Sequence, residues 1–288
     1  MKFHVPDASV VRQELTGENI YTLTINSPEI AHEAQPGQFA HLRYGNSADP
    51  LLRRPLSIND VEREKGWVVF SYQVVGKGTQ LLSELKAGDM LDVIGPLGHG
   101  FETDFCGKKV GLIGGGLGIA PLVFLGRKLA LQNQVQAFWG ARSRELLPRL
   151  AMGENFTTGE DVDFPFSSTV VTEDGSSGRK GLVTKILLEQ LAADAQGTQA
   201  TQGAQDFPER FDLLFACGPK PMLVAVAQLA REYNIPLQVS LESVMACGVG
   251  ACLGCTIKGK KKGEDRKTQF KVCQDGPVFW AEEVLWGE

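Results

Sequence analysis

The residues best suited to chemistry are four cysteines near the end of the chain. Three have C-x4-C-x2-C spacing in the segment MACGVGACLGC, and a lone fourth follows: Cys247, Cys252, Cys255 and Cys273. This spacing is that of plant-type [2Fe–2S] sites, which four thiolates hold. The small residues between the cysteines suit a loop whose backbone N–H groups face sulfur. The sequence therefore favours an iron–sulfur cluster on these four thiols.

Two other uses of these thiols stay open at this point. Zinc also binds four thiolates, but structural zinc sites usually take two C-x2–4-C pairs. Here three cysteines lie on one side and only Cys273 on the other. The remaining alternative is a set of buried thiols without metal. Cys106 has no neighbouring cysteine, and we expect it to be structural.

A glycine-rich segment, LIGGGLGIAPL, has the pattern of a strand, a turn and the start of a helix. Gly115, Gly116 and Gly118 let a dinucleotide approach the backbone, and the helix N-terminus faces its phosphates. The segment departs from G-x-G-x-x-G because Pro121 stands where the helix begins, and proline suits a first helical turn. We predict a dinucleotide site here.

Two later strand ends leave details of nucleotide binding open. Arg142 and Arg144 follow the next strand, in WGARSRE, where they either meet a 2′-phosphate or are plain surface charge. The choice between NAD and NADP is therefore not settled. Cys217 ends the strand in FACGPKPML, at the sheet edge where ligands bind. It either contacts a nicotinamide or is a small buried thiol.

Two segments among the first hundred residues suit a flavin nucleotide. RRPLS carries Arg53 and Arg54, and arginine forms bidentate contacts with pyrophosphate. GKGTQLLS places Gly78 and Thr79 at the start of a helical turn, where free N–H groups face phosphate. Each motif is weak alone, and two surface arginines at a strand start are the alternative for RRPLS.

Three sequence patterns divide the chain into three parts. Together they predict a multidomain protein with a β domain and an α/β domain. Residues 1–104 are short β-branched or aromatic runs between turn residues, which predicts a small antiparallel barrel. Residues 105–239 alternate strands with helices, which predicts a parallel sheet. Within them, 193–210 is rich in Ala, Gln, Thr and Gly, and we expect a flexible surface insertion. Residues 240–288 form a small C-terminal cysteine domain.

The amino-acid composition limits the kinds of binding partner that we expect. The 288 residues include 29 basic and 34 acidic side chains, a net charge of −5 that does not indicate nucleic acid or an anionic membrane. The basic segment KGKKKGEDRK at 258–267 mixes both signs, and we expect a solvated hairpin turn. No stretch predicts a membrane helix or a secretory signal. We expect a cytoplasmic protein with reduced thiols.

Taken in order, several segments resemble one family. They are RRPLSI, GKGTQLLS, GPLGHGF, GGGLGIAPL, CGPKPM and SLESVMACGVGACLGCTIK…KVCQDGPVF. Together they resemble the electron-transfer subunit of class 1B dihydroorotate dehydrogenase, in the ferredoxin reductase superfamily. The similarity covers almost the whole chain, and the cysteine segment is its most specific part. The chain departs from this pattern in the insertion at 193–210. It also has Gln73 where an arginine is expected after the tyrosine, which puts one flavin contact in question.

The resemblance implies FAD, NAD(H) and a [2Fe–2S] cluster as cofactors, with the cluster on the four cysteines. The flavin-binding residues that it implies lie in three short segments: Arg53, Arg54, Pro55, Leu56 and Ser57; Ser71, Tyr72 and Gln73; Gly78 and Thr79. It also implies a partner, an FMN-containing catalytic subunit that oxidises dihydroorotate to orotate in pyrimidine biosynthesis. The expected assembly is a heterotetramer with two subunits of each kind.

The expected activity connects one-electron and two-electron carriers. Electrons from the partner's FMN would pass singly through the cluster to FAD, and then as a hydride to NAD+. This needs no acid–base residue, and we predict no catalytic side chain. One alternative is an NAD(P)H:ferredoxin-type reductase or sulfide dehydrogenase subunit with the same domains. The other is a non-catalytic, zinc-stapled nucleotide-binding module.

Overall fold

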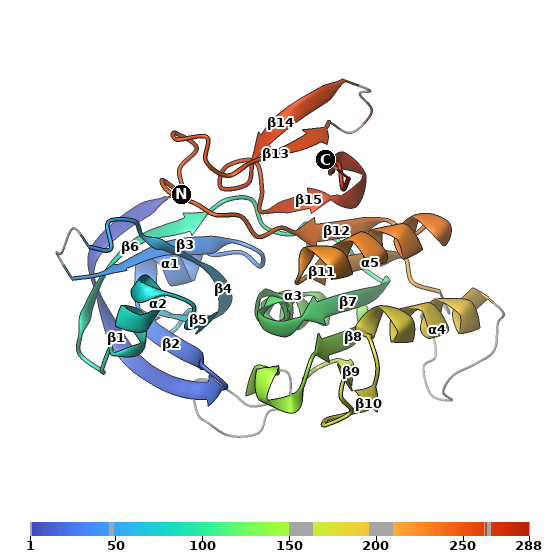
Figure 1. The fold of residues 1–288 in the computed structure, drawn as a ribbon, viewed down its shortest axis with the longest axis horizontal. Coiled ribbons are helices and arrows are strands. Elements are labelled where there is room, and N and C mark those ends of the chain that lie inside the picture. Colours follow the sequence, from blue (N-terminus) through green and yellow to red (C-terminus); the bar gives the residue numbers. More distant parts are fainter. Residues whose placement is uncertain are drawn as a thin grey trace.

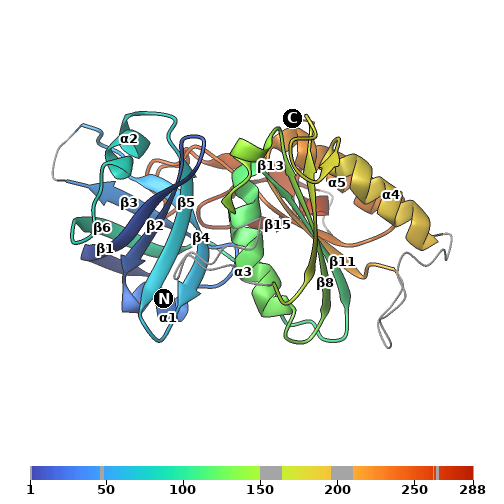
Figure 2. The same cartoon turned by 90° about the horizontal axis from the view of Figure 1, so that it is seen from below.

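The structure is a computed structural model, and it describes residues 2–45, 49–149, 164–195, 210–261, 263 and 266–287. Figure 1 shows a barrel, a larger sheet flanked by helices, and a small hairpin beside both. Helix α3 (Ile119–Leu129) lies between the barrel and the sheet, as Figure 2 shows. The predicted fold class, an antiparallel barrel followed by a parallel sheet, is confirmed.

The barrel closes six antiparallel strands in the order β1-β2-β5-β4-β3-β6. Side chains alternate between its two faces, as they must in any strand. In β3, for example, Ala40 and Leu42 pack in the barrel core, so Phe39 and His41 point out of it. The elements of this part are β1 Phe3–Gly17, β2 Ile20–Asn26, α1 Pro28–Glu33, β3 Phe39–Tyr44, β4 Arg54–Glu62, β5 Trp67–Gln73, α2 Lys77–Ser83 and β6 Met90–Leu97.

The second part is a seven-stranded sheet in the order β10-β9-β8-β7-β11-β12-β15. Every neighbouring pair is parallel except the last. Its central strand β7 is buried along its length, as expected for a strand covered on both faces. The elements up to this edge are β7 Lys109–Gly115, η1 Gly116–Gly118, α3, β8 Gln134–Ala141, η2 Arg144–Leu146, β9 Ser167–Thr172, β10 Arg179–Lys180, α4 Val183–Ala195, β11 Leu213–Cys217, α5 Lys220–Glu232 and β12 Leu237–Ser240.

Helix α3 holds the barrel against the sheet. Its Leu122 and Val123 pack in the core on the sheet, whereas Phe124 packs in the barrel core. Arg127 of the same helix also forms an ion pair with Asp60 of β4. Helices α4 and α5 lie on the opposite face of the sheet (Figure 2). Helix α3 is therefore the element that joins the barrel to the sheet.

The C-terminal segment leaves the sheet after β12 and then returns to it. Strands β13 (Thr256–Lys260) and β14 (Lys267–Lys271) form a hairpin, as predicted for the basic segment. Strand β15 (Val278–Trp280) then pairs antiparallel with β12, and η4 (Ala281–Glu283) follows. The cysteine segment is therefore anchored to the sheet at both ends.

Residues 196–209, most of the predicted insertion, lie outside the described residues. In the part of the chain that the structure describes, no helix is both long and apolar enough to cross a membrane.

Candidate functional site

A cavity of about 440 Å³ lies where the barrel meets the sheet. Eight of the residues that the resemblance implied for FAD line it: Arg54, Pro55, Leu56, Ser57, Ser71, Tyr72, Gln73 and Thr79. They come together because β4 and β5 are antiparallel neighbours, with Ile58 opposite Phe70. Two residues from the same set, Arg53 and Gly78, are not in the lining.

Arg53 points away from this cavity because it has another partner. Its guanidinium forms an ion pair with the Asp92 carboxylate, and its Nη1 donates to the Asp92 carbonyl at 2.8 Å. Arg54 instead lies over the first turn of α2, so close that Gly78 has no room for a β-carbon. The Thr79 hydroxyl is used within that turn, where it accepts from the Val75 N–H at 3.0 Å.

The back wall of the cavity is buried and hydrogen-bonded. The side-chain amide of Asn59 lies 2.6 Å from Ser71 Oγ and ties β4 to β5. The Tyr72 hydroxyl donates to Gln13 Oε1 at 3.0 Å, and its ring stacks on Tyr21 at 5.8 Å. Burial and the nearby Tyr21 raise the pKa of Tyr72, so its hydroxyl stays protonated. The wall is therefore a neutral, preformed surface.

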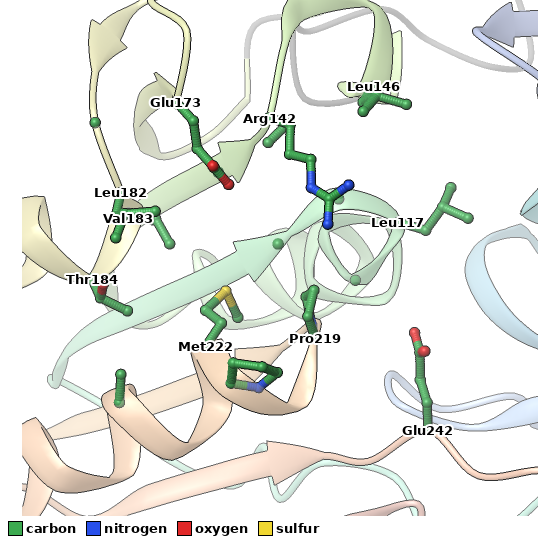
Figure 3. Close-up of a pocket in the computed structure, with 18 of the residues that line it drawn as sticks. Leu117, Arg142, Leu146, Glu173, Leu182, Val183, Thr184, Pro219, Met222 and Glu242 are labelled. Carbon is green, nitrogen blue, oxygen red and sulfur yellow. The ribbon is translucent and has the colours of Figure 1, made fainter.

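A second cavity of about 710 Å³ opens at the carboxyl edge of the sheet (Figure 3). Gly115, Gly116 and Gly118, the predicted dinucleotide glycines, all line it. Gly116 has a φ of +54°, which favours glycine. A β-carbon on Gly118 would meet the Gly218 nitrogen at 2.6 Å, because β7 and β11 are parallel neighbours whose end turns touch.

Arg142 and Glu173 project into this cavity, and Glu242 lies on its far side (Figure 3). Arg144, the other arginine considered from the sequence, is not in the lining. Glu173 was not predicted from the sequence. Glu173 directly follows β9, far beyond the roughly 20 residues at which a dinucleotide fingerprint places its acid, so no sequence motif marked it.

The two cavities meet around residues that line both of them: Gln73, Leu117, Gly118 and Glu242. Cys217 lies beside this junction, in the wall of the smaller cavity. Its burial, together with the nearby Glu242 carboxylate, raises the pKa of the Cys217 thiol to about 12. Desolvation also raises the pKa of Glu242. Burial therefore disfavours the charged form of both groups at the junction.

The four predicted cluster ligands lie together as two pairs. The Cys252 N–H donates to the Cys247 sulfur at 3.4 Å in one pair, and Cys273 lies against Cys255 in the other. The Ala251 N–H donates to the Cys247 sulfur at 3.3 Å, and the Cys273 N–H to the Cys255 sulfur at 3.4 Å. Burial alone would raise the pKa of Cys247, but hydrogen bonds from the backbone of Val249, Cys252 and Ala251 lower it overall.

The arrangement of the thiol pairs can be compared with the donor set of a [2Fe–2S] cluster, which takes two protein ligands at each iron. Two thiol pairs with backbone N–H groups aimed at sulfur match that donor set.

The cysteine segment is next to the smaller cavity. Met245 lines that cavity and packs in the same buried cluster as Cys255 and Cys273. Phe39, from the outer face of β3, belongs both to this cluster and to the cavity wall. The two cavities and the cysteine segment thus form a continuous series, each in contact with the next.

Comparisons with known proteins agree with this series. Residues 242–285 match the model of the iron–sulfur cluster binding domain of dihydroorotate dehydrogenase B, and residues 112–228 match the oxidoreductase NAD-binding domain. Among solved structures, a chain of an NADH-dependent reduced ferredoxin–NADP oxidoreductase is 30% identical, with a TM-score of 0.76, over 98% of this chain and 91% of that one. A ferredoxin NADP+ reductase from Neisseria gonorrhoeae has a TM-score of 0.60 at 18% identity over 81% of this chain and 92% of its own, which shows the fold alone.

Two curated relatives carry the name dihydroorotate dehydrogenase B (NAD(+)), electron transfer subunit. The protein from Desulforamulus reducens is 37% identical over 97% of this chain and 98% of its own length. The protein from Caldanaerobacter subterraneus subsp. tengcongensis is 39% identical with the same coverage. The resemblance seen in the motifs is confirmed: the chain belongs to the family of dihydroorotate dehydrogenase B electron transfer subunits.

Proposed function

We propose that the chain passes electrons from a catalytic dihydroorotate dehydrogenase subunit to NAD+, through a [2Fe–2S] cluster and FAD. The observation that carries this proposal is the unbroken series of cysteine segment, smaller cavity and larger cavity. Met245 links the first two, and Glu242 lines both cavities. When bound, the flavin exchanges two electrons with nicotinamide and single electrons with the cluster.

We assign the smaller cavity to FAD. Arg54 is the charged group in its lining best suited to the pyrophosphate, since a guanidinium makes bidentate contacts with phosphate oxygens. Ser57, Ser71 and Tyr72 offer hydroxyl groups along its wall. Gln73 offers a neutral amide where the family pattern has an arginine. Arg53 and Gly78 act indirectly: one holds the barrel together, and the other leaves space for Arg54.

We assign the larger cavity to NAD(H). Gly115, Gly116 and Gly118 let the pyrophosphate approach the start of α3. The Glu173 carboxylate is suited to accept hydrogen bonds from the ribose hydroxyls and to repel a 2′-phosphate, which favours NAD over NADP. The nicotinamide would then lie at the opposite end, near Glu242 and Cys217, where the cavities meet.

The chain's own residues bind and orient; none is required to transfer a proton. Cys217, with its pKa of about 12, presents a neutral thiol to the nicotinamide end. We therefore propose no catalytic acid or base.

The partner is expected to dock over the cysteine segment. Val244 is 86% exposed and Leu253 is 60% exposed, and Val249 is also open to solvent. Cys252 is exposed among them, whereas Cys255 and Cys273 are buried. An apolar rim around one edge of the proposed cluster suits a protein contact.

The finer features of the assembly are part of the same proposal. They are an FMN-containing partner, a heterotetramer, a role in pyrimidine biosynthesis and a cytoplasmic location. The six cysteines form no disulfide bond, which supports the cytoplasmic location. The proposed domains are 1–104 for FAD, 105–239 for NAD and 240–288 for the cluster. The pairing of β15 with β12 makes the last of these continuous with the NAD-binding sheet.

Anaerobic purification of the chain together with a catalytic dihydroorotate dehydrogenase subunit tests the proposal. We expect a stable complex with flavin, iron and acid-labile sulfide, in which dihydroorotate reduces NAD+. A chain that reduces ferredoxin with NAD(P)H but forms no such complex would support the ferredoxin reductase alternative. A colourless, zinc-loaded protein would contradict both.

A further inference from the structure

One buried group near the proposed cluster is not used by the electron path described above. His41 has no exposed surface, and neither of its ring nitrogens has a hydrogen-bond partner in the described structure. Buried polar side chains almost always have such a partner, because leaving one unpaired costs about 1–3 kcal/mol. A fully buried imidazole with two unpaired nitrogens therefore points to a ligand.

The strand geometry shows where the His41 ring is directed. Ala40 and Leu42 pack in the barrel core, so the side chains of Phe39 and His41 point to the outer face of β3. Phe39 belongs to the buried cluster that also contains Cys255 and Cys273. The imidazole therefore faces the C-terminal segment.

The nearest part of that segment is the residue after the first predicted cluster ligand. A β-carbon on Gly248 would lie 2.7 Å from His41 Cε1, 2.8 Å from Nε2 and 2.9 Å from Nδ1. The ring edge that carries both nitrogens therefore faces the loop. Gly248 is required there twice, by this contact and by its φ of +69°.

We propose that His41 is a positioning residue for the [2Fe–2S] cluster, and that its ring N–H donates a hydrogen bond to the sulfur atoms held by the loop that begins at Cys247. Hydrogen bonds to sulfur are one of the means by which a protein sets the potential of an iron–sulfur cluster. A donor stabilises the added electron, so His41 makes the cluster easier to reduce. This inference rests on the cluster assigned under the proposed function.

The pKa of the His41 imidazole indicates that the ring is a neutral hydrogen-bond donor. Burial, and then the positive charge of Arg53, lower the pKa of His41 to about 4. At neutral pH the imidazole therefore carries one N–H and one free acceptor nitrogen. It adds a directed donor to the cluster loop without adding a charge.

The test is made on the cofactor-loaded complex with two variants of His41. His41→Phe keeps an aromatic ring of similar size but has no N–H, and His41→Gln keeps a side-chain donor. We expect the midpoint potential of the cluster, followed by electron paramagnetic resonance, to become more negative in His41→Phe. In His41→Gln it should stay nearer to the wild-type value. Equal potentials in wild type and His41→Phe would overturn the proposal.

A second measurement starts from the wild-type protein and detects the contact directly. In wild-type protein labelled with ¹⁵N only at histidine, pulsed electron paramagnetic resonance of the reduced cluster should detect a ¹⁵N nucleus coupled to the electron spin. The matched control is His99→Gln, because His99 Nδ1 donates to the Gln274 carbonyl at 2.7 Å beside the last ligand. The coupling should persist in His99→Gln and be lost in His41→Gln and His41→Phe. No coupling in a wild-type protein that shows the cluster signal would overturn this inference alone, whereas absence of any cluster signal would overturn the proposed function itself.

Discussion

The guanidinium of Arg53 is paired with the carboxylate of Asp92, whereas its neighbour Arg54 faces the smaller cavity. Asp92 also binds Arg43 at 3.0 Å and His4 at 2.7 Å, so it gathers three side chains on the outside of the barrel. The two adjacent arginines of one motif thus make different contacts. Arg53 is paired within the barrel, and Arg54, which donates to the Leu52 carbonyl, lines the cavity that we assign to FAD.

Replacement of each arginine in turn should distinguish FAD binding from stabilisation of the barrel. Arg54→Ala should weaken FAD binding about 10- to 100-fold, since a hydrogen bond to a charged group contributes roughly 1.5–3 kcal/mol. Arg53→Ala, the matched control, should lower stability while it leaves FAD affinity within a few-fold of wild type. Titration of the apoprotein with FAD, followed by flavin fluorescence, measures both. A larger loss of affinity in Arg53→Ala would reverse the assignment.

The Asp92 cluster predicts a pH-dependent contribution to stability. Burial alone would raise the pKa of Asp92, but hydrogen bonds and charge from Arg53 and His4 outweigh it and lower that pKa below its ordinary 3.8. A carboxylate with a lowered folded-state pKa stabilises the fold above its ordinary pKa, and the contribution is lost as the pH falls through the folded-state value.

Asp92→Asn should therefore lower the melting temperature at pH 7 by about 3–10 °C, from roughly 1–3 kcal/mol of lost interaction. The difference from wild type should shrink as the pH is lowered below 3.8. Calorimetry of the two proteins across this range is the measurement. A difference that stays constant down to the lowest pH would show that the charge of Asp92 is not what stabilises the barrel.

Much of the architecture was predictable because it follows from local pattern. Short runs of β-branched and aromatic residues predicted the barrel, and the LIGGGLGIAPL segment predicted a strand, a turn and a helix, as β7 and α3 are. The cysteine spacing also carried its own information, since a C-x4-C-x2-C loop brings three thiols together over a few residues. The fourth, Cys273, joins them through the β13–β14 hairpin.

The contacts that could not be predicted join distant parts of the chain. The Arg53–Asp92 pair forms only when β6 closes the barrel beside β3. The contact between His41 and Gly248 requires the barrel, the sheet and the C-terminal segment to be in place together. Local propensity contains no information on either.

Glu173 should determine the choice of nucleotide. Glu173→Ala removes the carboxylate that is suited to the ribose hydroxyls, and the ratio of kcat/KM for NAD+ over NADP+ should fall about 10- to 100-fold. Arg144→Ala is the control, because Arg144 is outside the cavity lining, and it should leave the ratio unchanged. Steady-state kinetics with both nucleotides measure this ratio. An unaltered ratio in Glu173→Ala would place the ribose elsewhere.

The exposed apolar rim should be needed for partner binding. Leu253→Asp places a charge beside the cysteine loop, and it should weaken association with the catalytic subunit at least about 10-fold, because a buried leucine contributes roughly 1.5–3 kcal/mol. Leu131, which is 81% exposed at the end of α3, provides the control variant Leu131→Asp. Titration calorimetry or gel filtration compares them. Equal weakening by both substitutions would mean that the rim is not a specific contact.

The central claim is tested most directly by electron flow in the Cys252→Ser complex. The complex is prepared anaerobically with the catalytic subunit, and reduction of NAD+ by dihydroorotate is followed at the nicotinamide absorbance. We predict that the variant loses the cluster signal and this reaction, while NADH still reduces its bound FAD. A Cys252→Ser complex that reduces NAD+ with dihydroorotate at the wild-type rate would contradict the account.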